Sequence, residues 1–344
     1  MITKLLLLAS IVLNTVGLKA QSLDIDKNLM QKEANSSTFV QASLDLPLPA
    51  ITVKPKIVPN APKPVIYTKS HILIDSESGT ILSEKEKDLK LPIASTTKVM
   101  TGILVLEKYN FDDIITVSPE AANQIGVDLS TIKGERITVR NFLKCLLINS
   151  SNRAAYALAE HYNNGTEQGI NKFVDLMNQK AKELGMQNTE YHDPAGLDVT
   201  GYSTAYDLTL VTKYAMKNPI FAGIVGTKEE DVTDVPGKIK YELRNSNRLV
   251  REWNYPGAIG VKTGYMPEAS HTLIAAVKRD GHTLISVVLY TMADTPSASA
   301  EESKKLFDWG FKYTRWGNES SMNLPTETST INSTVNNDSG LIAE

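Results

Sequence analysis

The chain has 344 residues, 42% of them hydrophobic and 22% charged, and 36 Lys and Arg against 39 Asp and Glu give a formal net charge of -3. This composition excludes wholesale disorder and a polytopic membrane protein. The balanced charge, with no basic stripe interleaved with aromatic residues, argues against a nucleic-acid-binding protein, and a single cysteine excludes an internal disulfide.

The first 20 residues have the features of a secretory signal peptide. Lys4 supplies a positive charge, Leu5 to Val16 are apolar or small and polar, and Gly17 and Ala20 offer cleavage sites. This run is shorter than the about 20 apolar residues of a membrane-spanning helix. We therefore expect export to the periplasm or the extracellular cell-wall space, with no stable membrane anchor after residues 1–20 are removed.

Two segments of unusual composition flank the rest of the chain. Residues 21–65 are polar and then rich in proline, which favours an extended, semi-rigid linker. Residues 317–344 are rich in Ser, Thr and Asn and have few large apolar side chains, which is typical of a disordered tail. This leaves residues 66–316 as one folded domain.

The predicted elements of this domain change from strands to helices and back to strands. Short strands are predicted at 71–74 and 81–82, followed by helices at 95–109, 138–147 and 154–162. Strands follow at 258–263, 272–277 and 283–290, with an Asp280-Gly281 hairpin turn between the last two and a closing helix at 299–313. This order predicts an α+β fold, in which one antiparallel sheet is built from both ends of the domain and packs against a helical cluster.

Three short motifs carry the candidate chemistry: Ser95-Thr96-Thr97-Lys98, Ser150-Ser151-Asn152 and Lys262-Thr263-Gly264. Each is weak alone, because Ser130-Thr131-Ile132-Lys133 repeats the first pattern and Ser321-Met322-Asn323 repeats the second. Only the copy at Ser95 follows a proline and opens a helix with buried positions. The order of the three motifs along the chain therefore favours an enzyme.

The first motif predicts a serine nucleophile with a lysine base. Residues three apart lie on one face of a helix, so the Lys98 amine can reach the Ser95 hydroxyl. Lys98 must be neutral to accept a proton, and burial, a helix N-terminus and a second cation such as Lys262 all favour its neutral form. A serine activated by a lysine with a lowered pKa is an established nucleophile.

The other two motifs supply groups that can bind a peptide. Ser150 can relay a proton between the lysines and a leaving group, and the carboxamide of Asn152 can hold a peptide bond. Lys262 and Thr263 suit a free carboxylate at a strand edge that can pair with an extended peptide. Gly264 lets the substrate approach the backbone closely.

Together these motifs resemble those of the serine D-alanyl-D-alanine carboxypeptidases, low-mass penicillin-binding proteins with a β-lactamase/transpeptidase-like fold. The segments 93–101, 193–198, 202–207 and 260–265 are also similar to that family, and the resemblance covers residues 66–316. It implies that Ser95 forms an acyl-enzyme with peptidoglycan stem peptides ending in D-Ala-D-Ala. The backbone N–H groups of Ser95 and Tyr265 would hold the oxyanion, β-lactams would inhibit covalently, and no metal or organic cofactor is needed.

Three alternatives remain. A class A-like β-lactamase needs a Glu-x-x-Leu-Asn loop for deacylation, and none lies between Asn152 and Lys262. A D,D-endopeptidase would use the same residues to cut cross-links. A non-catalytic cell-wall-binding module would have no use for the complete set of Ser95, Lys98 and Ser150.

Overall fold

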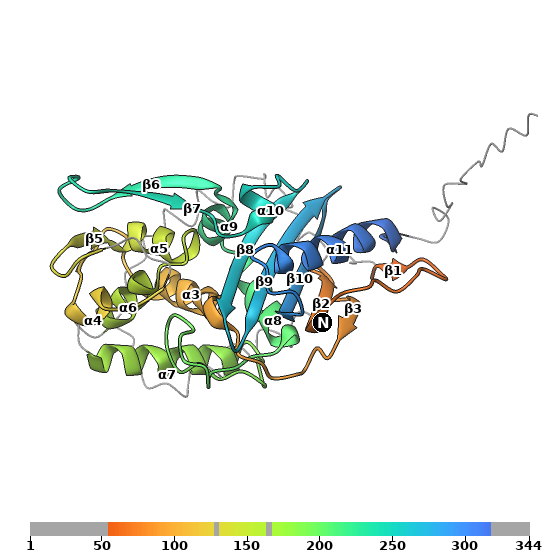
Figure 1. Ribbon diagram of the computed structural model, residues 1–344, viewed down its shortest axis with the longest axis horizontal. Coiled ribbons are helices and arrows are strands. Elements are labelled where there is room, and N and C mark those ends of the chain that lie inside the picture. The colour runs from red at the N-terminus through yellow and green to blue at the C-terminus, as the bar shows by residue number, and fades with distance from the viewer. Residues whose placement is uncertain (1–53, 127–130, 163–166, 318–344) are drawn as a thin grey trace, which may run out of the picture. The chain divides into compact units, whose positions relative to one another are not determined.

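A five-stranded antiparallel sheet organises the structure (Figure 1). The computed structural model describes residues 54–126, 131–162 and 167–317. The strands lie in the order β3, β2, β10, β9 and β8, with the bounds β2 Thr68–Asp75, β3 Ile81–Lys85, β8 Ala258–Met266, β9 Ser270–Arg279 and β10 His282–Thr291. Since β2 and β3 come from the start of the domain and the other strands from its end, the predicted α+β fold is confirmed.

The turn between β9 and β10 fixes the register of the central hairpin. Asp280 and Gly281 connect the strands, with φ of 48° and 83°. Two residues with positive φ form the kind of turn whose twist matches that of the flanking strands, which is why Asp-Gly is favoured there. Arg279 pairs with His282 across the turn, so the predicted hairpin is confirmed.

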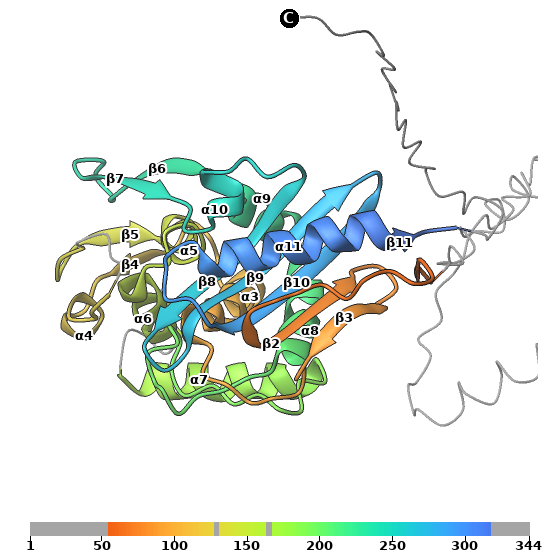
Figure 2. The ribbon, with the colours of Figure 1, turned by 45° about the vertical axis from the view of Figure 1, so that its right-hand side comes forward.

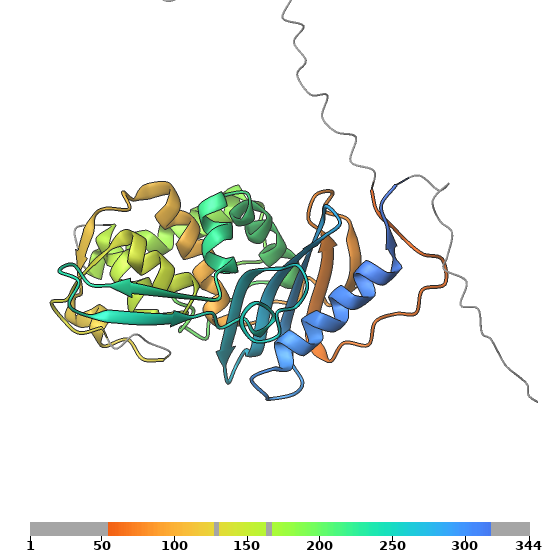
Figure 3. The same ribbon diagram turned by 90° about the horizontal axis from the view of Figure 1, so that it is seen from above.

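Different helices cover the two faces of the sheet (Figures 2 and 3). In β2, Ile72 and Ile74 belong to one buried cluster and Leu73, between them, belongs to the other. Successive side chains of a strand point to opposite faces, so both faces of β2 are buried. Helix α11, Ala298–Tyr313, covers one face, and a Cβ at its Gly310 would lie only 2.7 Å from Leu73.

The other face of the sheet carries most of the helical region. Its helices are η1 Ala94–Thr97 (a 3₁₀ helix), α3 Lys98–Lys108, α4 Pro119–Ala122, α5 Val139–Leu147, α6 Asn152–His161, α7 Glu167–Glu183, α8 Ala205–Met216 and α9 Pro219–Gly226. Two ribbons, β4 Ile114–Thr116 with β5 Arg136–Thr138 and β6 Glu229–Thr233 with β7 Lys240–Arg244, and the short helix α10 Arg248–Arg251 complete this part of the chain. The three helices predicted for this region are present, whereas α4, α7, α8, α9 and α10 were not predicted.

Side-chain caps determine where two of these helices begin. Thr138 Oγ1 accepts a hydrogen bond from the Asn141 backbone N–H at 3.2 Å, as expected for the cap of α5. Ser151 Oγ accepts from the Ala154 N–H at 3.1 Å, so α6 begins at Asn152, before the predicted start. This cap places Asn152 on the first turn of α6 and leaves Ser150 in the break before it.

The end of the predicted linker contacts the domain. Residues Lys56–Ile57 form strand β1, which pairs with β11 (Thr314–Arg315), and Trp309 Nε1 donates to the Pro62 carbonyl at 2.6 Å. The predicted signal peptide, the linker up to residue 53 and the tail from residue 318 lie outside the described residues, and the domain boundaries stay a prediction. Within the described ranges, no helix has the length and apolarity needed to cross a membrane.

Candidate active site

Ser95 and Lys98 lie where η1 joins α3. Ser95 is in the 3₁₀ turn and Lys98 is the first residue of the α-helix, so the single helix predicted from residue 95 is two helices of different pitch. Ala94, just before the serine, has a φ of 46°, which is a strained conformation for a residue with a Cβ. This turn places Lys98 Nζ 2.7 Å from Ser95 Oγ.

The partners of Lys98 orient its amine towards the serine. Besides Ser95 Oγ, Nζ donates to Asn152 Oδ1 at 2.8 Å and to the Ala195 carbonyl at 2.7 Å. Both of these oxygens can only accept hydrogen bonds. A neutral Lys98 therefore keeps its two hydrogens on Asn152 and Ala195, and its lone pair points at the Ser95 hydroxyl.

The environment of Lys98 favours this neutral form. Its side chain is 0% exposed. Burial lowers its pKa to about 7, and the negative charge of Asp193 opposes this shift. Near neutral pH a substantial fraction of Lys98 is therefore unprotonated, as a general base requires.

Lys262 is the second buried lysine of the site. It lies on β8 with 1% exposure, and its Nζ donates to Ser150 Oγ at 2.8 Å and to the Thr263 carbonyl at 3.0 Å. Burial, and then the positive charge of Lys98, lower the pKa of Lys262 well below its usual value. Since two like charges are costly in a buried site, the lysine pair holds one proton more readily than two.

An open groove of about 620 Å³ runs past the serine. Its walls include six of the predicted residues: Ser95, Ser150, Asn152, Thr263, Gly264 and Tyr265. Lys98 and Lys262 do not line it among the described residues; they lie behind Ser95 and Ser150. The carboxylate-anchoring role of Lys262 stays a prediction, and the cations that line the groove together with Thr263 are Arg244, Arg248 and Arg251.

Gly264 allows β8 to pass very close to the nucleophile. A Cβ at this position would lie 3.1 Å from the Ser95 backbone nitrogen and 2.6 Å from Thr272 Oγ1. β8 is the edge strand on this side of the sheet, and Tyr265 beside the groove is 54% exposed. The strand edge therefore borders Ser95, as the predicted binding of an extended peptide requires.

Asn152 lies in the groove wall and also makes contacts that were not predicted. Its Oδ1 accepts from Lys98 and its Nδ2 donates to the Ile125 carbonyl at 2.5 Å, so both ends of the carboxamide already bind protein groups. The second hydrogen of Nδ2 and the second lone pair of Oδ1 remain for a substrate. In this structure the main contact of Asn152 is with the base.

Sequence reasoning did not assign a role to Asp193 or to the Ala195 carbonyl. Both belong to the Asp-Pro-Ala-Gly-Leu-Asp segment, which was noted only for its similarity to the family. Of the second motif copies, Ser130 and 321–323 lie outside the described residues. Over the ranges that are described, no group of three or more His, Cys, Asp or Glu side chains is arranged to hold a metal ion.

Known proteins are similar to this chain in both sequence and fold. A peptidase S11 family model, described as D-alanyl-D-alanine carboxypeptidase, matches residues 57–293. The D-alanyl-D-alanine carboxypeptidase DacF of Bacillus subtilis is 37% identical over 71% of this chain, a match that spans 62% of the relative's own length. The D-alanyl-D-alanine carboxypeptidase of Streptomyces strain K15 is 33% identical over 72% of this chain and 89% of its own length.

A second activity and a solved structure also appear among the similar proteins. The D-alanyl-D-alanine endopeptidase of Pseudomonas aeruginosa is 35% identical over 60% of this chain and 65% of its own length. The crystal structure of the Streptomyces K15 DD-transpeptidase aligns with a TM-score of 0.68 and 33% identity, covering 73% of this chain and 99% of that one. The chain therefore belongs to the D-alanyl-D-alanine carboxypeptidase family of serine peptidases.

Proposed function

We propose that this protein removes the terminal D-alanine from peptidoglycan stem peptides through an acyl-enzyme on Ser95. The observation that carries the proposal is the contact between Ser95 Oγ and a buried Lys98 whose other two partners are hydrogen-bond acceptors. A serine in this setting has a base of suitable pKa at hydrogen-bond distance. Membership of the D-alanyl-D-alanine carboxypeptidase family supports a peptide ending in D-Ala-D-Ala as the substrate.

In the acylation step, Ser95 Oγ attacks the carbonyl carbon of the bond between the two D-alanines, and its proton passes to Lys98 Nζ. The oxyanion lies on the backbone N–H groups of Ser95 and Tyr265, which support it without reorganising. The tetrahedral intermediate then breaks its C–N bond. The departing amine takes up, through Ser150, the proton that Lys98 accepted, which leaves Lys98 neutral again; the Ser150 hydroxyl accepts a hydrogen bond from Lys262.

In the deacylation step, water attacks the acyl carbon while Lys98 again accepts a proton; the bond from the acyl carbon to Ser95 Oγ then breaks, and Lys98 returns the proton to Ser95 Oγ, 2.7 Å away. The departure of D-alanine leaves room for this water. A β-lactam instead keeps its leaving nitrogen tethered to the acyl group, so a penicilloyl adduct on Ser95 should persist for minutes or longer. Rapid turnover of penicillin without an adduct would favour the β-lactamase alternative.

The groove supports binding of the substrate as an extended peptide along β8. Thr263 is half-buried in the wall, and its hydroxyl is hydrogen-bonded to Ser246 Oγ at 2.6 Å. The terminal carboxylate of the substrate would accept from Thr263, with the positive charge of Arg248 beside it in the wall. A charge-assisted contact of this kind favours peptides with a free terminal carboxylate.

A D,D-endopeptidase is the second candidate, because a relative with that name is 35% identical to this chain. Both activities would use Ser95 and Lys98, and they differ in what leaves after acylation. A cell-wall substrate also supports export, with residues 1–20 as the signal peptide.

The decisive experiment is incubation of the purified protein with two muropeptides, one ending in D-Ala-D-Ala and one cross-linked dimer, followed by mass spectrometry. The proposal expects loss of one D-alanine from the first. Cleavage confined to the dimer would replace it with the endopeptidase. No change in either muropeptide, with intact binding to cell wall, would replace it with the binding module.

A further inference from the structure

The carboxylate of Asp193 organises the turn beside the catalytic lysine. Its Oδ1 accepts from the backbone N–H groups of Ala195 and Gly196, both at 2.6 Å. Its Oδ2 accepts from the N–H groups of Leu197 and Asp198, at 2.8 and 2.7 Å. Four backbone N–H donors on one carboxylate, which is only 7% exposed, hold residues 193–198 in a single conformation.

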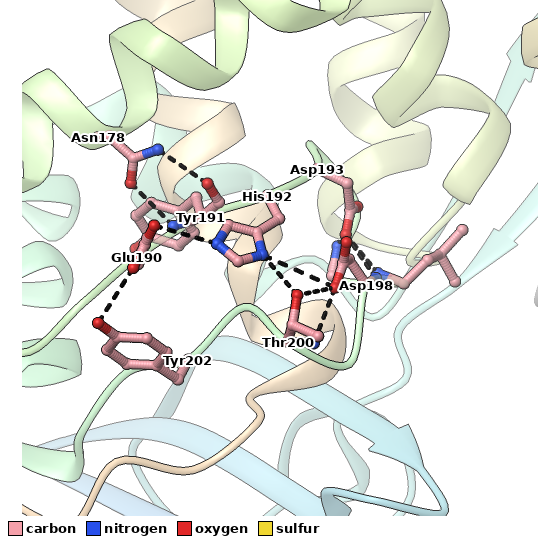
Figure 4. A network of polar contacts seen from close by, with 10 residues as sticks. Asn178, Glu190, Tyr191, His192, Asp193, Asp198, Thr200 and Tyr202 are labelled. Atoms are coloured by element: carbon pink, nitrogen blue, oxygen red, sulfur yellow. Dashed lines mark hydrogen bonds and ion pairs between the residues drawn. The ribbon is translucent and has the colours of Figure 1, made fainter.

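A second set of polar contacts supports the same turn from outside (Figure 4). The ring of His192 lies between Glu190 Oε1, 3.2 Å from Nε2, and Thr200 Oγ1, 2.7 Å from Nδ1. Thr200 in turn donates to Asp198 Oδ1 through its backbone N–H, at 2.8 Å, and its hydroxyl. The turn that contains Asp193 is therefore fixed at both ends.

This turn contacts the segment that carries the nucleophile at three points. The Ala195 carbonyl accepts from Lys98 Nζ at 2.7 Å. The Pro194 carbonyl accepts from Thr101 Oγ1 at 2.6 Å, one helical turn further along α3. Gly196 packs against Ala94, and no Cβ would fit between them. The position of Asp193 thus determines where a hydrogen-bond acceptor of Lys98 lies.

Asp193 also acts on Lys98 through its charge. Its negative charge raises the pKa of Lys98, against the effect of burial. The other charged or titratable groups around this region are Lys262 on β8, Tyr156 on α6, and Glu190, His192 and Asp198 at the two ends of the turn. Burial, and next the charge of Asp193, raise the pKa of Tyr156, so this tyrosine stays neutral. Asp193 is thus the negatively charged group that acts on Lys98.

We propose that Asp193 is a positioning residue for acylation: it holds the Ala195 carbonyl on Lys98, so that the lysine lone pair faces Ser95, and it places a negative charge near this buried lysine. The proposal deepens the proposed function and rests on it. It makes two separable claims, one about orientation and one about charge.

The test measures the second-order rate constant for acylation by a fluorescent penicillin, as a function of pH, in the full mature chain. The rate constant comes from the time course, so an inactive fraction does not change it. In Asp193→Asn, the amide NH₂ replaces the acceptor of the Leu197 and Asp198 N–H groups, and the charge is lost. We expect a lower maximal rate. We also expect the acidic limb, the part of the pH–rate curve where the rate rises as Lys98 loses its proton, to move by about one unit to lower pH, because loss of a nearby negative charge lowers a lysine pKa.

Thr101→Val tests orientation without changing the charge. It removes the hydroxyl that donates to the Pro194 carbonyl, so the maximal rate should fall while the acidic limb keeps its position. Asp234→Asn is the matched control, because Asp234 also accepts a backbone N–H in a turn, that of Ile239 at 2.8 Å, between β6 and β7. We expect its rate and its limb to match those of the wild type.

The outcomes separate this inference from the proposed function. A wild-type protein that is neither labelled by penicillin nor able to release D-alanine would remove the proposed function itself. With an active wild type, an unmoved limb in Asp193→Asn would overturn the claim about charge. An unchanged maximal rate in Thr101→Val would overturn the claim about orientation, and this holds even if Asp193→Asn does not fold.

Discussion

Gly196 offers a sharp test of how the 193–198 turn supports the nucleophile. Its φ is 78°, and a Cβ at this position would lie 1.9 Å from the Ala94 carbonyl oxygen and 2.7 Å from Thr97 Oγ1. Gly185, after α7, has almost the same φ, 79°, but a Cβ there would meet nothing within 4 Å. The two alanine substitutions therefore share the backbone cost and differ only in the contact.

The expected loss of folding stability has two parts, the cost of the positive φ and the cost of the contact that the new Cβ makes. A positive φ costs a residue with a Cβ about 1–2 kcal/mol, and forcing an atom into a packed site costs about 1–3 kcal/mol more. Gly185→Ala should lose only the first, whereas Gly196→Ala should lose about 2–5 kcal/mol in total. For a domain of this size the larger loss lowers Tm by about 4–20 °C.

The same substitution should also change acylation, because relief of the clash moves Ala94 and hence Ser95 away from Lys98. A displacement of about 1 Å at a reacting group can cost about 100-fold in rate. We expect a loss of this order for Gly196→Ala and none for Gly185→Ala, measured by calorimetry and by penicillin labelling of the folded protein. If the two variants match in both Tm and rate, the turn does not support the nucleophile in the way described.

Four further predictions concern the catalytic residues and the domain boundaries. Ser95→Ala should abolish D-alanine release and penicillin labelling, and a labelled peptide from another part of the chain would refute the choice of nucleophile. Acylation by the wild type should rise with pH through about 7, where Lys98 loses its proton, and a rate that is flat across this range would argue against Lys98 as base. Because Lys262 contacts Ser150, Lys262→Ala should slow acylation by peptides and by neutral esters alike; a loss confined to substrates with a carboxylate would support the anchoring role predicted from the sequence. A fragment of residues 54–317 should melt at a higher temperature than one of residues 66–316, because only the longer one keeps the pairing of β1 with β11; equal Tm values would show that this pairing does not contribute.

Sequence patterns predicted those parts of the site that depend on short spacings. The separation of Ser95 and Lys98 by three positions was enough to predict their contact, although the turn between them is 3₁₀ rather than α-helical. The three motifs together with their flanking segments predicted the family. The strand that carries Lys262-Thr263-Gly264 was predicted from the β-like run that begins at Ala258, whereas its place at the edge of the sheet comes from the structure.

The contacts that sequence patterns missed join distant parts of the chain. Nothing in the residues near Ala195 shows that its carbonyl binds Lys98, because any residue can provide a carbonyl oxygen. The positive φ of Ala94 has no sequence signal either, since glycine usually marks that conformation and here the glycine is Gly196, across the contact. The contact of Asn152 with Lys98 was not predicted, because it depends on how α6 packs against α3; the substrate-binding role of Asn152 stays a prediction.

The sheet built from both ends of the chain has a consequence for how this protein folds. His71 of β2 pairs with Val288 of β10, so the central pairing closes a loop that contains almost the whole domain. Pairing of this kind gives a high contact order, and it pays the entropy of loop closure before most of the stabilising contacts form. During synthesis, β2 cannot pair with β10 until β10 has been made. Since Lys262 arrives on β8 in the same late segment, the acyl-transfer centre and the sheet are completed together, and a chain truncated before β8 has neither.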